Sequence, residues 1–137
     1  MHSDPDCLFC GIVAGSIPSE IIDSDERTVA FMDINPATRG HVLVVPREHA
    51  NDLLAIDPED LAAVARTAQR VAATMPDRLG ADGVNLLNSC GREAWQTVFH
   101  FHMHVIPRYE GDPLELPVRP QEGDPDEIAE DAEKLRG

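Results

Sequence analysis

The sequence predicts one α+β domain in which a mainly antiparallel sheet packs against one long helix, followed by a short C-terminal helix. Several short stretches rich in Val, Ile and Leu are bounded by proline, glycine or polar residues, which is typical of strands. One central segment has apolar residues at intervals of three and four, which is typical of a helix. Strands and helices do not alternate regularly, so a parallel sheet is not expected, and 137 residues suit a single domain.

The first half of the chain predicts a short N-terminal helix and three strands. In chain order these are a turn or short helix over residues 7–14, strands over 19–25 and 28–34, and a buried strand over 41–45. Gly15 closes the first element. Pro46 closes the last, because proline cannot donate to a strand ladder. Residues 34–40 contain Asn-Pro and Gly and are a predicted loop.

The long helix has a clear start signal. Asp57 can cap its first turn, and Pro58 suits the first helical position. Its apolar face, which core packing explains, comprises Leu61, Val64, Ala65, Ala68, Val71, Ala72 and Met75. Pro76 and Gly80 predict its end.

A strand over 83–88 and a polar loop over 89–95 lead into the most informative stretch, residues 98–107. Three of the chain's six histidines, His100, His102 and His104, alternate there with apolar residues. Because successive side chains of a strand point to opposite faces, an extended backbone places these imidazoles on one face. The residues that would then face the core are Phe99, Phe101, Met103 and Val105, with Pro107 ending the strand.

A row of imidazoles allows three interpretations. It can be a histidine-rich surface strand without a function, a metal site, or a nucleophile that attacks phosphorus together with its helpers. The apolar character of the alternate positions disfavours the first interpretation.

The charge of the chain limits its partners. The formal net charge is −14, and residues 110–137 hold ten acidic and three basic residues, which predicts an acidic, proline-rich tail with a possible short helix over 126–136. Nucleic acids and anionic membranes attract basic surfaces, so neither is an expected partner. No run approaches the roughly 20 apolar residues of a membrane span, and the N-terminus lacks the features of a signal peptide. We therefore expect a cytoplasmic protein.

The motif His-Phe-His-Met-His-Val-Ile at 100–106 resembles the signature of the histidine-triad (HIT) family, His-x-His-x-His followed by apolar residues. Further matching segments occur in family order at 31–36, 40–46, 88 and 96–98. The resemblance covers about residues 7–109 and predicts a HIT domain over 1–109, with the tail over 110–137. It also implies a homodimer whose sheet continues across two subunits.

The resemblance implies a role for each matching position. His102 corresponds to the nucleophile, which attacks an α-phosphorus and forms a nucleotidyl-histidine that water then cleaves. His104 lies beside it, toward the phosphate or leaving group, and His41 supports the triad. The implied nucleotide contacts are Phe9, Asp33, Ile34, Asn88, Gln96, Thr97 and Val98.

Some positions keep an alternative interpretation. Asp33 could be a turn residue, and Asn88 could cap a strand end. Trp95 departs from the family pattern, in which glycine is usual. It either projects outward as a stacking surface for the leaving group or narrows that side of the site.

The segment Cys7-Leu8-Phe9-Cys10 supplies half of a tetrahedral metal site, since zinc prefers four cysteine or histidine ligands. The chain has no second cysteine pair, so two histidines must complete such a site. Some bacterial Hint-like members carry zinc on matching positions, which implies a structural zinc on Cys7, Cys10, His49 and His100. A redox dithiol and two inert core thiols are the alternatives.

The resemblance implies cleavage at the α-phosphate of a purine nucleotide of the AMP or GMP type, without an organic cofactor. The N-terminal cysteine pair is similar to bacterial Hint-like members, whose substrates are nucleoside 5′-phosphoramidates. A Fhit-like hydrolase of dinucleoside polyphosphates is the alternative within the family. A nucleotide-binding interaction protein with weak catalysis and a zinc-organised structural module are the alternatives outside it.

Overall fold

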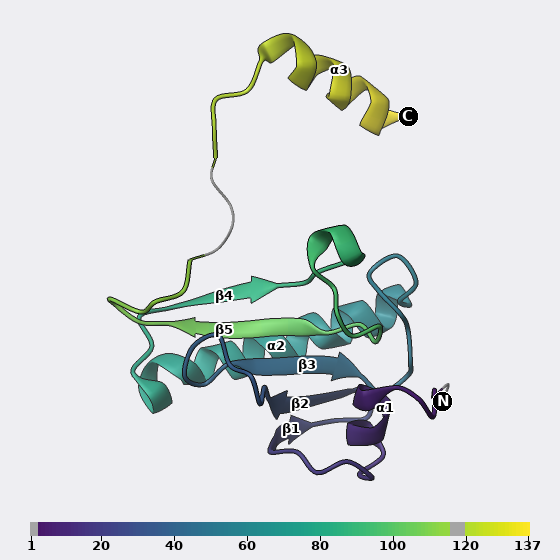
Figure 1. The fold of residues 1–137 in the computed structure, drawn as a ribbon, viewed down its shortest axis with the longest axis vertical. Coiled ribbons are helices and arrows are strands. Elements are labelled where there is room, and N and C mark those ends of the chain that lie inside the picture. Colours follow the sequence, from purple (N-terminus) through teal and green to yellow (C-terminus); the bar gives the residue numbers. More distant parts are fainter. Residues whose placement is uncertain (1–2, 116–119) are drawn as a thin grey trace.

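The computed structural model describes residues 3–115 and 120–137. Within them a five-stranded antiparallel sheet has the order β1-β2-β3-β5-β4 (Figure 1). The strands are β1 (Ile21–Ser24), β2 (Thr28–Met32), β3 (Val42–Pro46), β4 (Gly83–Leu87) and β5 (Met103–Arg108). The helices are α1 (Leu8–Val13), α2 (Pro58–Leu79) and α3 (Pro125–Arg136), with a short 3₁₀ helix, η1, over Arg92–Ala94. The predicted α+β class is confirmed.

Two apolar layers cover the two faces of the sheet. The long helix α2 lies across one face, and α1 lies against the other near the ends of β2 and β3 (Figure 1). Because side chains alternate along a strand, β3 contributes Val42 and Val44 to the α2 layer and Leu43 and Val45 to the α1 layer. Leu43 is paired with His104 of β5, so this histidine lies on the α1 face.

The helix α2 begins as predicted but ends later than its proline. The carboxylate of Asp57 accepts a hydrogen bond from the amide of Glu59 (2.7 Å), which satisfies one free donor of the first turn. The helix then runs through Pro76 to Leu79, so the prediction that Pro76 ends it is wrong. A proline this close to the C-terminus disturbs only the last turn. Gly80, with a φ of 71°, makes the left-handed cap.

The triad strand is shorter than predicted. β5 begins at Met103, so residues 98–102 lie outside the strand. The amide of Phe101 donates to the carbonyl of Ala50 (2.7 Å), beyond the end of β3, instead of pairing with a strand. Phe101 and Val105 are buried as predicted, but Phe99 is 38% exposed and does not face the core. The backbone bends over residues 98–100, which is the cause of this difference.

Pro107 does not end β5, which continues to Arg108. In an antiparallel strand the amide and carbonyl of one residue point to the same side. The carbonyl of Pro107 accepts a hydrogen bond from the hydroxyl of Thr38 (2.6 Å), on the side where β3 has already ended. Proline lacks an amide hydrogen, but at Pro107 this hydrogen would point to a side where no strand is paired. The sheet therefore loses no hydrogen bond between strands.

The C-terminal helix α3 forms close to its predicted bounds and stands away from the sheet (Figure 1). None of its residues is buried, and its first turn is acidic. Among the described helices, none is both long enough and apolar enough to cross a bilayer.

Candidate functional site

His102, just before β5, and His104, within it, border a cavity of about 290 Å³ on the α1 face of the sheet. His102 and His104 line it together, with ring centroids 5.0 Å apart. Five of the seven implied nucleotide contacts also line it, namely Phe9, Asp33, Ile34, Thr97 and Val98. The apolar wall continues through Leu8, Ile12, Ile17, Phe31 and Leu43, most of which the sequence did not single out. The cavity thus has an apolar wall and a polar end, which is formed by Asp33, His102 and His104.

The position of the His102 proton follows from its hydrogen bond. Nδ1 of His102 lies 2.8 Å from the backbone carbonyl oxygen of His100. A carbonyl can only accept, so Nδ1 carries the proton and Nε2 keeps its lone pair. Burial lowers the pKa of His102, which keeps this ring neutral near pH 7. The edge of the ring packs against Phe9, with centroids 5.1 Å apart.

A chain of hydrogen bonds also fixes the proton on His104. The amide of Ala37 donates to Nδ1 of His41 (3.0 Å), so Nε2 of His41 carries a proton. That nitrogen lies 2.9 Å from Nδ1 of His104, which must accept, and the His104 proton is therefore on Nε2. Burial, with the nearby His102 and His41, lowers the pKa of His104 to about 4. The cavity is thus bordered by one ring with a bare nitrogen and one with an N–H donor.

Asp33 lies close enough to His41 and His104 for the three residues to resemble a metal site. Hydrogen bonding accounts for this cluster, because Ala37 occupies one nitrogen of His41 and His104 occupies the other. Asp33 also accepts a hydrogen bond from the amide of Asn35 (2.8 Å), which is the turn role considered from the sequence. Its second carboxylate oxygen lies 3.6 Å from Nε2 of His41.

Gln96 and Asn88 do not line the cavity with Thr97 and Val98. The buried amide of Gln96 donates to the carbonyls of Asn51 (2.7 Å) and Val98 (3.1 Å) and accepts from the amide of Gly91 (2.8 Å). The side chain of Asn88 donates to the carbonyl of His102 (3.0 Å). Its oxygen is buried without a partner among the described residues. Both side chains therefore shape the backbone that borders the cavity.

Trp95 projects outward from the loop. Its φ of 70° is the only positive value at a described residue other than glycine, and its side chain is 65% exposed. Left-handed backbone favours glycine, which explains why a glycine would suit this position. The residues that border the 290 Å³ cavity do not include it, so it does not narrow that cavity.

Cys7, Cys10, His49 and His100 come together beside the cavity, with their ligand atoms all within 4.8 Å of one another. Sγ of Cys10 lies 3.3 Å from Nδ1 of His49 and 3.4 Å from Nδ1 of His100, and Sγ of Cys7 lies 3.4 Å from Nδ1 of His100. Tetrahedral zinc with bonds of about 2.3 Å to sulfur and 2.0 Å to nitrogen separates these ligands by about 3.5 Å. The spacing of the four residues therefore fits zinc.

The second nitrogen of each of these histidines is held by an oxygen. Nε2 of His49 lies 2.9 Å from the side-chain oxygen of Asn51, and Nε2 of His100 lies 2.8 Å from the carbonyl of Pro46. Each ring therefore turns the lone pair of Nδ1 toward the sulfurs, as metal-binding histidines do. Burial lowers the pKa of His100 to about 4, so this ring is neutral, as a ligand must be.

Asn51 connects the two parts of the candidate site, and the sequence did not reveal it. Its side chain contacts His49 of the Cys/His cluster, and its backbone carbonyl accepts a hydrogen bond from Gln96 of the loop. Its position two residues after His49 is only a weak sequence signal for these contacts. The contact to Gln96, which is 45 residues away, exists only in the folded chain.

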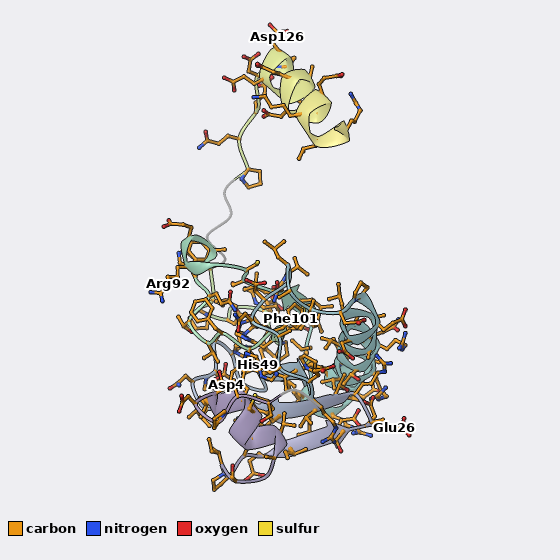
Figure 2. All side chains as sticks on the ribbon, turned by 90° about the vertical axis from the view of Figure 1, so that its right-hand side faces the viewer. Asp4, Glu26, His49, Arg92, Phe101 and Asp126 are labelled. Atoms are coloured by element: carbon orange, nitrogen blue, oxygen red, sulfur yellow. The ribbon has the colours of Figure 1, made fainter. Side chains whose placement is uncertain are left out.

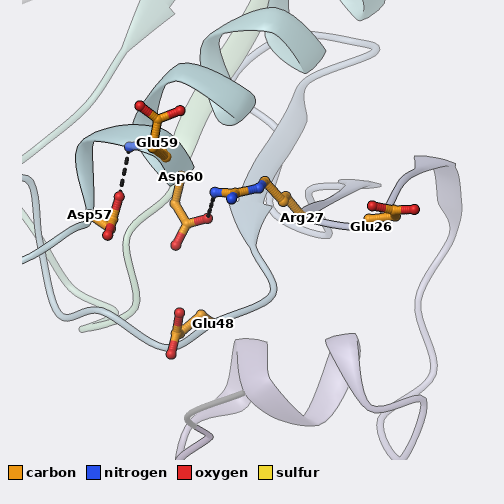
Figure 3. Close-up of a pocket in the computed structure, with 6 residues that line it drawn as sticks. All are labelled: Glu26, Arg27, Glu48, Asp57, Glu59 and Asp60. Atoms are coloured by element: carbon orange, nitrogen blue, oxygen red, sulfur yellow. Dashed lines mark hydrogen bonds and ion pairs between the residues drawn. The ribbon is translucent and has the colours of Figure 1, made fainter.

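A larger hollow of about 480 Å³ lies at the N-terminal end of α2 (Figure 3). It is lined by Glu26, Arg27, Glu48, Asp57, Glu59 and Asp60. Asp57 caps the helix, and Arg27 pairs with Asp60 at 2.9 Å. Five carboxylates around one arginine make this hollow unfavourable for an anionic ligand.

Known proteins match most of the chain. The HIT domain model matches residues 14–111. The protein named "Protein hit" of Bacillus subtilis is 41% identical over 113 residues, which are 82% of this chain and 78% of that protein.

Solved structures of similar proteins superpose on most of this chain. A Streptococcus mutans protein, SMU.412c, superposes with a TM-score of 0.93 at 38% identity, covering 98% of this chain and 85% of that one. A zinc-bound histidine triad family protein from Mycobacterium smegmatis has a TM-score of 0.78 at 44% identity, covering 85% and 84%. A histidine triad nucleotide-binding protein from Candida albicans has a TM-score of 0.84 at 30% identity, covering 96% and 95%.

Proposed function

Because this chain belongs to the histidine-triad (HIT) family, we propose that it is a nucleotidyl hydrolase or transferase that cleaves nucleoside 5′-phosphoramidates at the α-phosphate. One observation carries the proposal. Nε2 of His102 keeps its lone pair because Nδ1 donates to the carbonyl of His100 (2.8 Å). This ring lines a cavity that has an apolar wall for a base.

The reaction has two steps. Nε2 of His102 attacks the α-phosphorus, the P–N bond to the leaving amine breaks, and the amine nitrogen takes up a proton from solvent. Water then attacks the nucleotidyl-histidine, which releases the nucleoside monophosphate and a proton and restores the free imidazole. His104 donates from Nε2 to the charge that develops on the phosphoryl oxygens or the leaving nitrogen.

The neighbouring residues hold the nucleotide in place. Asp33 accepts hydrogen bonds from the ribose hydroxyls, and Phe9 and Ile34 contact the base. Thr97 and Val98 border the phosphate. Gln96 and Asn88 position the backbone that contacts it, since their side chains are bonded within the loop and to the His102 carbonyl.

Two substrates, supplied separately, test the proposed function. We expect an adenosine phosphoramidate to be hydrolysed to AMP with a kcat/KM at least about tenfold higher than that for a diadenosine polyphosphate, a difference of about 1.4 kcal/mol in the barrier. The reverse order would favour the Fhit-like alternative. Binding of AMP without turnover of either compound would favour the interaction protein.

His104 should stay neutral well below the ordinary pKa of a histidine, since burial lowers its pKa to about 4. An imidazole NMR titration should show this ring unprotonated at pH 5.5. The unfolded chain protonates first, because its histidine pKa is about 6.5. This residue's contribution to stability is therefore complete above pH 6.5 and is lost as the pH falls toward 4. A midpoint near 6.5 in the folded protein would contradict the assignment.

We further propose that Cys7, Cys10, His49 and His100 hold a structural zinc ion. The close approach of their ligand atoms supports this. Four protein ligands leave no open position, so zinc stiffens the backbone before β5 and does not activate water.

The proposed assembly is a cytoplasmic homodimer. β4 lies at the edge of the described sheet, and its Leu86 and Leu87 are 51% and 37% exposed. An exposed apolar edge strand favours pairing with a second copy. Sedimentation of the purified chain checks this assembly.

A further inference from the structure

We propose that Cys7 and Cys10 form a peroxide-sensitive thiolate pair whose oxidation to a disulfide releases zinc and disables the nucleophile His102. The inference rests on the zinc site proposed above and assigns it a regulatory role. Access of an oxidant, the geometry of the pair and its connection to His102 support it independently.

An oxidant can reach the pair from solvent. A hollow of about 340 Å³ is lined by Asp4, Cys7, His49 and Asn51, and continues along Thr97, Val98 and Phe99. Figure 2 shows Asp4 and His49 near one another on this side of the molecule. Cys10 and His100 are only 4% and 0% exposed, whereas Cys7 is partly exposed. Peroxide therefore meets Cys7 first.

The backbone of the pair suits a disulfide. Cys7 is the N-cap of α1, and Cys10 lies in its first turn. Residues three apart at a helix start have Cα atoms about 5 Å apart, and disulfides span about 4.4–6.8 Å. The amide of Cys10 already donates to Sγ of Cys7 (3.2 Å), and the amide of Asp4 donates to Sγ of Cys10 (3.4 Å). Zinc ligation requires both sulfurs as thiolates, which is the form that reacts with peroxide.

The proposed step is a two-electron oxidation by hydrogen peroxide. The thiolate of Cys7 attacks one peroxide oxygen and becomes a sulfenic acid, and the O–O bond breaks to give water after proton uptake. The thiolate of Cys10 then attacks the sulfur of Cys7, and the sulfenic oxygen leaves as a second water after a further proton uptake. The pair loses two electrons, peroxide gains them, and Zn²⁺ leaves because a disulfide is no longer an anionic ligand.

Two connections carry the change to the proposed active site. His100 is a zinc ligand whose backbone carbonyl holds Nδ1 of His102 at 2.8 Å. His49 is a second ligand, held by Asn51, whose carbonyl accepts from Gln96 of the loop beside the cavity. Loss of zinc frees both histidine rings from the sulfurs, so the nucleophile and the loop lose an anchor at the same time.

The test treats zinc-loaded protein with hydrogen peroxide and follows three signals. A chromophoric chelator reports zinc release, peptide mass mapping reports a disulfide between Cys7 and Cys10, and phosphoramidate hydrolysis reports turnover. We expect one zinc per disulfide and at least a tenfold loss of turnover, all reversed by a dithiol and added zinc. Cys90→Ser, the matched control, should behave like the native protein.

Each contrary result is distinct. Zinc retained in peroxide-treated protein, or oxidation confined to Cys90, would overturn the proposal. Stoichiometric zinc release with unchanged turnover would overturn the connection to His102. A protein that binds zinc and forms the disulfide but hydrolyses no nucleotide would instead refute the proposed hydrolase, because two of the three signals do not depend on catalysis.

Discussion

Replacing His102 with asparagine should reduce kcat by about four orders of magnitude or more without unfolding the protein. Asparagine has no nucleophilic nitrogen, so the covalent route is closed. Its amide can still donate to the His100 carbonyl, which Nδ1 of His102 contacts at 2.8 Å. The substitution therefore removes the bare nitrogen and keeps the hydrogen bond that the fold uses. The measurement is steady-state hydrolysis of an adenosine phosphoramidate.

Two controls separate chemistry from structure. AMP binding and zinc content of His102→Asn should stay near native values, because neither depends on Nε2. In His104→Asn, kcat should fall less, by about 10²–10⁴-fold, since this substitution removes a donor and leaves the nucleophile. Rapid-quench mass spectrometry should trap a nucleotide adduct on the native chain and none on His102→Asn. Turnover by His102→Asn within tenfold of native would exclude this histidine as the nucleophile.

The fold and much of the candidate site could be predicted from sequence patterns of short range. The helical spacing of apolar residues predicted α2, and the proline and acidic residues around Asp57 predicted its start. The alternation around His102 placed it and His104 beside one another, with Phe101 and Val105 in the core. These features depend on neighbours in the chain, which local propensity describes well.

The errors lie where distant segments override a local pattern. Residues 98–102 alternate like a strand, but Phe101 bonds to the carbonyl of Ala50 and the His100 ring turns toward the cysteines. The resemblance implies that Gln96 and Asn88 contact the nucleotide, which stays a prediction; the structure adds that their side-chain donors bond to backbone carbonyls. No local pattern shows which carbonyl will lie within reach of a side chain once the chain has folded.

The same distant contacts connect the proposed zinc site to the proposed nucleophile. A nucleophilic imidazole must be held with its lone pair in one direction, and Nδ1 of His102 has a single backbone acceptor for this purpose. That acceptor belongs to His100, whose ring lies against Cys7 and Cys10 at 3.4 Å. In the proposed site, a zinc ion that fixes the His100 ring would also steady its backbone carbonyl, so the proposed metal binding and the orientation of His102 would share one residue.

Substituting alanine for Cys10 should lower the free energy of unfolding by about 3 kcal/mol or more, and Tm by about 10 °C or more. Cys10 lies near both histidines of the cluster, so its loss leaves three ligands and weakens zinc binding. Thermal unfolding with and without a chelator measures the effect, and chelation should destabilise the native chain but hardly affect Cys10→Ala. Cys90→Ser, outside the cluster, should change Tm by no more than about 2 °C.

The kinetic consequence of Cys10→Ala separates orientation from simple loss of fold. Below its Tm, the variant should show a lower kcat with little change in KM, since Phe9, Asp33 and Ile34 still line the cavity while the His100 carbonyl is less firmly held. Added zinc at high concentration should restore part of both Tm and kcat. If the variant keeps the native Tm and its response to chelator, the four residues do not form a metal site. If Tm falls and kcat does not, His100 anchors the fold without orienting His102.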